Sequence, residues 1–228
     1  IEALHHAKTK ISESIEIKLI DTEKYDKKKA VENSKEITEL DGIIIPGGFG
    51  ARGVNGKLNI IEYARTHDVP FLGLCYGMQL AIVEYARNVC GIKEANTTEI
   101  DKDCKEPIIT ILPGQDGKTF GGTMRLGSQV TMLSKGSRVA EIYGKLKIEE
   151  RHRHRFEVNP KYHKILKEKG LVLSGFDPTG KLLEFIEIKN HPFFIGTQAH
   201  PELKSKLLTP HPLFVEFVRA TKKRKEKK

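Results

Sequence analysis

The first half of the chain alternates short apolar runs with amphipathic stretches, a pattern typical of strands that alternate with helices. Residues 43–45 and 71–74 are apolar apart from one glycine, as strands covered on both faces of a sheet are. Each run is followed by helical spacing, at 57–67 and 78–88. We therefore expect an α/β fold with an open, mostly parallel sheet and helices on both faces. The other elements expected in this half are a helix within 1–11, a strand at 15–19 and a surface helix within 27–39.

The second half is less regular. Residues 114–122 are a glycine-rich loop that we expect to be mobile, and 124–133 are expected to form a hairpin turning at Gly127–Ser128. Proline at the start and glycine past the end predict a helix over 160–169. The remaining expected elements are strands at 108–112, 171–176, 182–188 and 193–197 and a helix at 212–220. Because no repeat or linker divides this pattern, we predict one domain over 1–221, followed by a basic tail at 222–228.

The positive charge of the chain is concentrated at its end. The formal net charge is +9, but residues 222–228 carry six positive charges and one negative, which leaves about +4 for the rest. We interpret the tail as a solvated end, with an electrostatic tether to RNA or a membrane as the alternative. Since no base-reading motif accompanies the tail, we expect no nucleic-acid partner.

Composition indicates a globular chain, because 38% of its residues are hydrophobic and 30% are charged. No apolar stretch reaches the roughly 18 residues that a membrane-spanning helix needs, so no membrane partner is expected. No secretory signal opens the chain. The three cysteines, Cys75, Cys90 and Cys104, form no CxxC pair and cannot build a disulfide framework. We therefore expect a reducing, cytoplasmic compartment, with Cys90 packed on a helix and Cys104 in a loop.

Cys75 lies at the expected junction between strand 71–74 and the following helix, with Gly73 and Gly77 two residues away on either side. This is the pattern of a nucleophile elbow, a tight turn that needs small neighbours and lifts the nucleophile out of the sheet. The start of the helix favours a thiolate there, and the N–H of Tyr76 is placed to donate to an oxyanion. The alternative is a buried structural cysteine between two incidental glycines.

Cysteine chemistry also needs a base and a group that orients it, and His200-Pro201-Glu202 supplies both directly after an apolar strand. Proline restricts the backbone between them, so that Glu202 can hold the histidine tautomer while the other ring nitrogen faces the thiol. The tripeptide alone is a weak signal, and together with the elbow it is a strong one.

A third glycine-rich segment, Pro46-Gly47-Gly48, follows strand 43–45, at the end of the strand where α/β proteins bind ligands. Its glycines let backbone N–H groups approach a ligand closely. A phosphate loop is excluded, because its spacing needs glycine at Ala51 and Ser or Thr at Leu58.

These three segments together resemble the class I glutamine amidotransferase family. Further segments resemble the glutaminase domains of CTP synthases within it, and the likeness runs from Ile1 to about Ala220: Asn96-Thr97-Thr98-Glu99, Gly121-Gly122-Thr123-Met124-Arg125-Leu126-Gly127 and Glu150-Arg151-His152-Arg153-His154-Arg155-Phe156-Glu157-Val158-Asn159. The resemblance implies a flavodoxin-like glutaminase fold. It also implies that a first strand is missing before residue 1 and that the ATP-dependent synthetase domain lies outside this chain.

The resemblance further implies a set of site residues. The catalytic triad would be Cys75, His200 and Glu202, and the oxyanion hole would be formed by the N–H groups of Gly48 and Tyr76. The implied glutamine contacts are Gly48, Tyr76, Gln79, Glu99 and Arg155. Glu99 and Arg155 suit the ammonium and the carboxylate of glutamine, although a basic surface cluster around Arg155 is the alternative. No metal site is expected, because His152 and His154 have no evident third ligand.

The expected activity is hydrolysis of L-glutamine to glutamate and ammonia, with no cofactor in this domain. The resemblance places ATP and Mg on the absent synthetase domain, where UTP would be aminated to CTP, with GTP as allosteric activator. It implies a homo-oligomer for the full-length enzyme. The alternatives are another class I amidotransferase, a γ-glutamyl hydrolase, or a silent binding module of the same fold.

Overall fold

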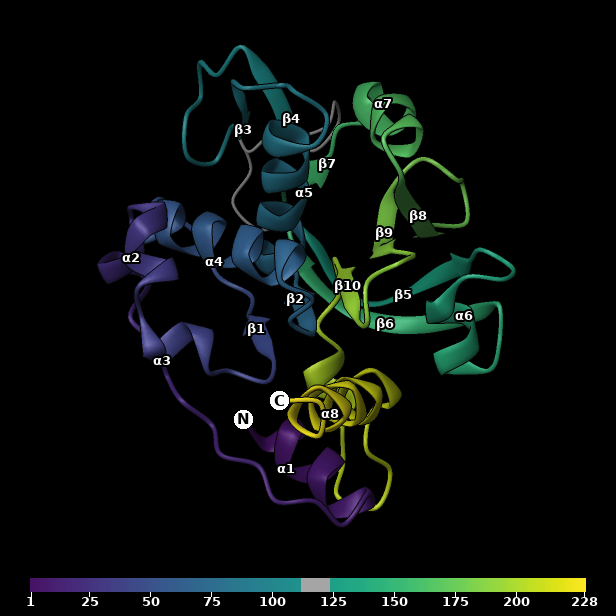
Figure 1. Cartoon of the computed structure of the whole chain (residues 1–228). Coiled ribbons are helices and arrows are strands. Elements are labelled where there is room, and N and C mark those ends of the chain that lie inside the picture. Colours follow the sequence, from purple (N-terminus) through teal and green to yellow (C-terminus); the bar gives the residue numbers. More distant parts are fainter. Residues whose placement is uncertain (112–123) are drawn as a thin grey trace.

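The computed structural model describes residues 1–111 and 124–228, so the predicted loop at 114–122 lies outside the described residues. The described part contains two sheets, with helices on both faces of the larger one (Figure 1). In sheet order, the large sheet consists of β1 (Ile43–Ile45), β2 (Phe71–Leu74), β10 (Phe194–Thr197), β9 (Leu183–Ile188), β8 (Leu171–Phe176), β5 (Arg125–Leu133) and β6 (Lys147–His154). The small sheet consists of β3 (Ala95–Thr97), β4 (Glu106–Thr110) and β7 (Glu157–Val158).

The α-helices are α1 (Glu2–Lys10), α2 (Lys28–Glu32), α3 (Lys35–Thr38), α4 (Val54–Thr66), α5 (Tyr76–Asn88), α6 (Arg138–Tyr143), α7 (His163–Glu168) and α8 (Pro212–Lys225). Three short 3-10 helices are η1 (Thr22–Tyr25), η2 (Pro160–Tyr162) and η3 (Pro201–Lys204). No helix within the described ranges is both long and apolar enough to cross a membrane.

The large sheet is mixed, and its parallel part is smaller than the sequence predicts. Among the described strands, β2 pairs in parallel with β1 and β10, whereas β10–β9, β9–β8, β8–β5 and β5–β6 are antiparallel. Only six residues, 177–182, join β8 to β9, which is too short for the crossover that parallel strands need. The α/β class is confirmed, and the expectation of a mostly parallel sheet holds only for β1, β2 and β10.

Two hydrophobic cores cover the two faces of the central strands. Phe71 and Phe194 stack at 4.5 Å between ring centroids on the face covered by α4 and α5. Leu72 and Ile195, the next residue in each strand, point into the second core, with α1, α6 and α8. This alternation explains why both strands are buried along their whole length, as the sequence predicts.

Two predicted elements are wrong. Residues 15–19 form neither helix nor strand, although their side chains alternate. The expected turn at Gly127–Ser128 is absent, because β5 pairs with β6 continuously from Arg125 opposite His154 to Met132 opposite Lys147. Gly127 lies inside the strand with a φ of 86°, which glycine adopts without strain.

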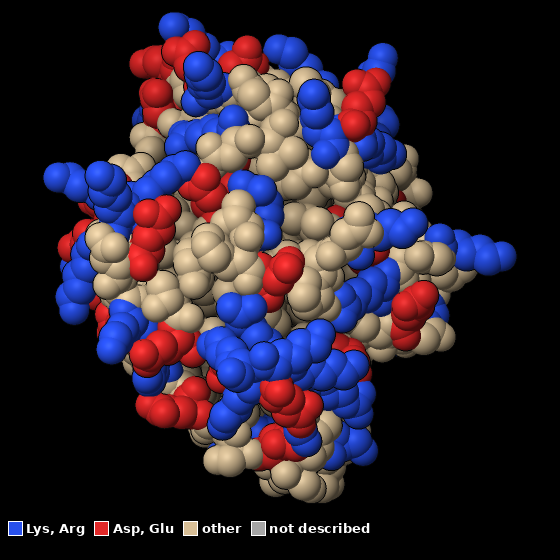
Figure 2. All heavy atoms as spheres, in the orientation of Figure 1, with Lys and Arg blue, Asp and Glu red and all other residues tan. Residues whose placement is uncertain are grey.

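The basic end of the chain is more ordered than the expected solvated tail. Helix α8 extends to Lys225, and Figure 2 shows Lys and Arg side chains gathered over it. Arg224 donates to the carbonyls of His67 and Asp68, and Lys228 forms an ion pair of 2.9 Å with Asp41. The end of the chain is therefore held against the sheet edge near β1.

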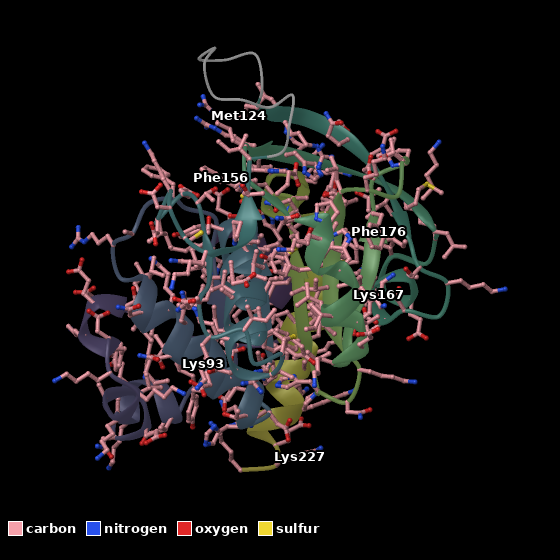
Figure 3. The ribbon with its side chains drawn as sticks, turned by 90° about the horizontal axis from the view of Figure 1, so that it is seen from above. Lys93, Met124, Phe156, Lys167, Phe176 and Lys227 are labelled. Atoms are coloured by element: carbon pink, nitrogen blue, oxygen red, sulfur yellow. The ribbon has the colours of Figure 1, made fainter. Side chains whose placement is uncertain are left out.

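Helix α7 packs beside β8, an interior strand in the antiparallel half of the large sheet. The ammonium of Lys167 lies 5.6 Å from the ring centroid of Phe176, and the two side chains are neighbours in Figure 3. Phe156, labelled in the same view, lies in the short link between β6 and β7. This link connects the large sheet to the small one and carries the residues around Arg155 to the site described next.

Candidate active site

The turn between β2 and α5 has the geometry of a nucleophile elbow. Cys75 has a φ of 49° and a ψ of −101°, a strained conformation for a residue with a side chain. A Cβ atom at Gly73 would lie 2.8 Å from the carbonyl carbon of Gly77, and one at Gly77 would lie 2.0 Å from the carbonyl oxygen of Ile45. Both glycines are therefore required by the close approach of α5 to β1 and β2.

His200 and Glu202 lie just beyond β10, the strand next to β2. The Nδ1 atom of His200 is 2.7 Å from Oε1 of Glu202. Hydrogen bonds to the Cys75 sulfur and, second, to Glu202 raise the pKa of His200 to about 10, against the opposing effect of burial. The structure thus brings the three predicted catalytic side chains together, with Glu202 fixing Nδ1 and leaving Nε2 for the sulfur.

Backbone hydrogen bonds fix the positions of Cys75 and His200 relative to each other. The Cys75 N–H donates to the carbonyl of Thr197 (2.7 Å), and the His200 N–H donates to the carbonyl of Arg151 on β6 (2.8 Å). A Cβ atom at Gly47 would lie 2.6 Å from Cε1 of His200, so the loop after β1 packs directly on the imidazole. The position of the ring is therefore set by three strands, β1, β6 and β10.

The two predicted oxyanion donors are adjacent. A Cβ atom at Gly48 would lie 3.6 Å from Cδ1 of Tyr76, which is ordinary contact. Neither backbone N–H donates a hydrogen bond to any described residue. Tyr76 also fixes the loop, since its hydroxyl donates to the carbonyl of Gly50 at 2.5 Å.

The predicted glutamine-binding residues come from three further segments. Glu99 accepts a hydrogen bond from the N–H of Gly50 (3.0 Å), and burial raises the pKa of its carboxyl. Gln79 is buried, and its amide nitrogen donates to the carbonyl of Phe156 (3.0 Å) and to Oε1 of Gln198 (3.1 Å). Both amide protons of Gln79 are thus used within the protein. Arg155 is half-buried in the link between β6 and β7.

Gln198 lies in the candidate site, although no motif in the sequence analysis selected it. Its amide nitrogen lies 3.6 Å from the Cys75 sulfur and donates to it, while its oxygen accepts from Gln79. Its position could have indicated a role, because a polar residue that lies between a buried strand and the catalytic histidine is well placed to contact the site.

A buried polar cluster lies behind His200 and includes His152 and His154, which the alternative interpretation had assigned to a basic surface cluster around Arg155. The strand β6 alternates exposed and buried residues, which turns His152 and His154 inward; their Nδ1 and Nε2 atoms are 3.0 Å apart. Arg125 contacts Glu184 at 2.6 Å and Glu157 at 3.3 Å. Burial raises the pKa of Glu157 to about 8 and of Glu184 to about 7, and it lowers the pKa of His152 to about 3.

Within the described ranges, no three His, Cys, Asp or Glu side chains are arranged to hold a metal ion. The chemistry that this arrangement can perform is nucleophilic attack by a thiol with an adjacent imidazole base. A carbonyl oxygen placed against the N–H groups of Gly48 and Tyr76 would receive two hydrogen bonds as it became negative.

Comparison with known proteins gives consistent results. The family model of class I glutamine amidotransferases matches residues 1–220. Two CTP synthases are each 50% identical: the protein of Methanocaldococcus jannaschii over 226 residues, or 96% of this chain, and that of Sulfolobus acidocaldarius over 218 residues, or 95%. The chain spans only 42% and 41% of the length of these relatives.

Among solved structures, the glutaminase domain of Trypanosoma brucei CTPS with bound acivicin superposes with a TM-score of 0.91 and 35% identity. The match covers 97% of this chain and 86% of that one. A putative GMP synthase subunit from Thermoplasma acidophilum, with a TM-score of 0.61 and 15% identity, shares the fold. The chain therefore belongs to the class I glutamine amidotransferase family and, within it, to the glutaminase domains of CTP synthases.

Proposed function

We propose that this chain hydrolyses the side-chain amide of L-glutamine to glutamate and ammonia, with Cys75 as nucleophile, His200 as base and Glu202 as the group that orients it. The single observation that carries the proposal is the strained Cys75 at the end of β2, close enough to the His200 imidazole to raise its pKa, while the Nδ1 of that ring lies 2.7 Å from Glu202. The acivicin-bound domain of 35% identity supports the same reading, because acivicin is bound there by a protein of the same domain family.

In the first half-reaction, the Cys75 thiolate attacks the amide carbon of glutamine and the carbonyl oxygen becomes an oxyanion. The N–H groups of Gly48 and Tyr76 stabilise that charge, and a single donor of this kind is worth about 3 kcal/mol of barrier. The imidazolium of His200 gives its Nε2 proton to the departing nitrogen. The carbon–nitrogen bond breaks, and ammonia leaves a γ-glutamyl thioester on Cys75.

In the second half-reaction, water attacks the thioester while His200 takes its proton. The carbon–sulfur bond then breaks, which releases glutamate and regenerates the thiolate and imidazolium. Throughout both steps, Glu202 keeps Nδ1 protonated, so that Nε2 always faces the sulfur and the substrate. Gln198 holds the sulfur from another side.

Two charged side chains suit the amino-acid end of the substrate. Glu99, held by the N–H of Gly50, provides a carboxylate for the α-ammonium. Arg155 provides a guanidinium for the α-carboxylate, in a planar geometry that fits two parallel hydrogen bonds. Gln79 acts mainly by positioning, since its amide nitrogen is engaged by Phe156 and Gln198.

For the longer protein, we propose that the ammonia serves the amination of UTP to CTP on a synthetase domain that uses ATP and Mg, with GTP as activator. This extension rests on the CTP synthases that are 50% identical to this chain over the aligned 226 and 218 residues. The expected oligomerisation of the full-length protein and its cytoplasmic location belong to the same proposal.

The proposal is tested by incubating the 228-residue chain with acivicin, an electrophilic probe, and measuring intact mass and tryptic peptides. We expect one adduct on Cys75, lost in Cys75→Ala and retained in the matched control Cys90→Ala. In excess glutamine, the wild type and Cys90→Ala should release glutamate, and Cys75→Ala should not. A folded wild-type chain that is not labelled and releases no glutamate would instead indicate a binding module of the same fold.

A further inference from the structure

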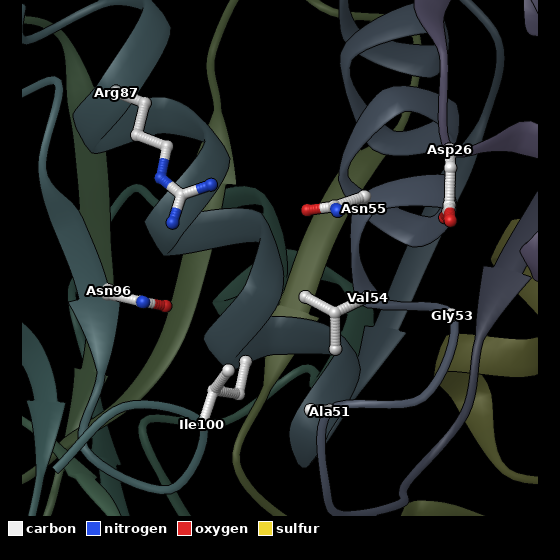
Figure 4. A pocket seen from close by; sticks show the side chains of 8 residues that line it. All are labelled: Asp26, Ala51, Gly53, Val54, Asn55, Arg87, Asn96 and Ile100. Atoms are coloured by element: carbon white, nitrogen blue, oxygen red, sulfur yellow. The ribbon is translucent and has the colours of Figure 1, made fainter.

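A cavity lies between α4, α5 and β3 (Figure 4). Its volume is about 240 Å³, several times the roughly 30 Å³ that one water molecule occupies in the liquid. Val54 and Ile100 form the apolar floor, and Arg87, Asn55 and Asn96 form the polar walls. In Figure 4 these three polar side chains extend toward the same space from three different elements.

Arg87 lacks a counter-ion among the described residues. Its Nε donates to the carbonyl of Ala95 at 2.6 Å, which fixes the guanidinium in place and leaves both terminal nitrogens without a described acceptor. Burial lowers the pKa of Arg87, and no carboxylate acts against that effect. Asp26 also lines the cavity, but Figure 4 places it beyond Asn55 as seen from Arg87.

The side-chain amides of the two asparagines are also available for a ligand. Neither Asn55 nor Asn96 makes a side-chain hydrogen bond to another described residue. An immobilised guanidinium whose two terminal nitrogens are free matches the two oxygens of a carboxylate or phosphate group. The amide groups of the asparagines can donate to the remaining oxygens of the same group.

We propose that this cavity is a binding site for a small oxyanion, a phosphate or carboxylate group, held by Arg87 with Asn55 and Asn96 as additional donors. The inference does not depend on the proposed glutaminase activity, because none of these three residues belongs to the candidate active site. The cavity is larger than one such group, so it has room for a small molecule that carries the group.

The experiment is a titration of the chain with inorganic phosphate and, separately, with acetate, followed by calorimetry in 0.15 M salt. The variants are Asn55→Ala and Asn96→Ala, with Asn190→Ala, an exposed asparagine outside the cavity, as the matched control. Asn55 is exposed and makes no side-chain hydrogen bond to a described residue, so its replacement leaves the fold intact. A fourth variant, Arg87→Met, removes the charge and is checked for folding by circular dichroism.

We expect saturable binding of at least one of the two anions. Asn55→Ala and Asn96→Ala should each weaken it about tenfold, which corresponds to about 1.4 kcal/mol, and Arg87→Met should abolish it. Asn190→Ala should bind like the wild type. A preference for phosphate or for acetate would show which of these two oxyanions the site binds more tightly. Binding of neither anion, or equal affinity in Asn96→Ala and Asn190→Ala, would overturn the proposal.

Discussion

Replacing Gly77 by alanine tests the structural basis of the elbow, because it adds a single methyl group at its tightest contact. The new Cβ would lie 2.0 Å from the carbonyl oxygen of Ile45 and 2.9 Å from its carbonyl carbon. To reach ordinary contact, the first turn of α5 must move away from β1 by at least about 1 Å. That turn carries both Cys75 and the N–H of Tyr76.

The expected loss of stability is modest. Overpacking of this kind costs about 1–3 kcal/mol, and alanine recovers roughly 0.5–1 kcal/mol through its higher helix propensity, so we expect a net loss of about 1–2 kcal/mol. The expected loss of reactivity is larger, because a misplacement of about 1 Å in a reacting group can cost 100-fold in rate. Stability and reactivity should therefore change by very different factors.

Stability is measured by urea unfolding, and reactivity by the rate at which acivicin labels Cys75. The matched control is Gly144→Ala, which also loses about 1 kcal/mol because Gly144 has a φ of 66°, but whose new Cβ meets no atom within 4 Å. The control should label at the wild-type rate. Labelling of Gly77→Ala at that same rate would show that the contact with Ile45 does not position the nucleophile.

Three further predictions concern stability and the site. The carboxyl of Glu157 has a raised pKa of about 8, so the folded state keeps a proton that the unfolded state releases above about pH 4.5, and stability falls as pH rises toward 8. Glu157→Gln should flatten that fall in urea midpoints measured from pH 5 to 8; an unchanged slope would contradict the assignment. Arg65→Met should cost about 3 kcal/mol, because it leaves the buried Glu84 carboxylate without its 2.7 Å partner, and the double variant with Glu84→Gln should recover part of this in the same unfolding assay. Gln198→Ala should slow acivicin labelling of Cys75 with little change in the unfolding midpoint, whereas a wild-type rate would leave Gln198 without a role at the sulfur.

The parts of the site that were predicted from the sequence depend on short-range constraints. Gly73 and Gly77 indicate a tight turn around Cys75 because each is needed within a few residues of it. His200 and Glu202 are two positions apart, so their contact follows from local backbone geometry. The family resemblance then supplied the link between these two distant segments.

The features that were missed depend on contacts between distant segments. The contact of Gln198 with Cys75 joins residues 123 positions apart, and no local pattern encodes it. Likewise, the antiparallel half of the sheet follows from strand order, with β10 inserted between β2 and β9. Residues 15–19 alternate like a strand but pair with none of the described strands.

The side chains at 222–228 are mostly exposed, as expected, but the continuation of α8 into this segment was not predicted, for a different reason. Composition alone favours a solvated end, but lysine is a good helix former and α8 is already nucleated by its apolar face against α1. The helix therefore continues through Lys225 before it ends.

The pairing of Leu74 with Thr197 in neighbouring parallel strands has an evolutionary consequence. The spacing of the thiol and the imidazole follows from the repeat of a sheet, about 4.8 Å between strands, and from the two residues, Gln198 and Ala199, that separate Thr197 from His200. Loops elsewhere can gain or lose residues during evolution without changing the distance between the thiol and the imidazole. One residue inserted between Thr197 and His200 would displace the base, so lineages that keep the chemistry should conserve the length of this segment.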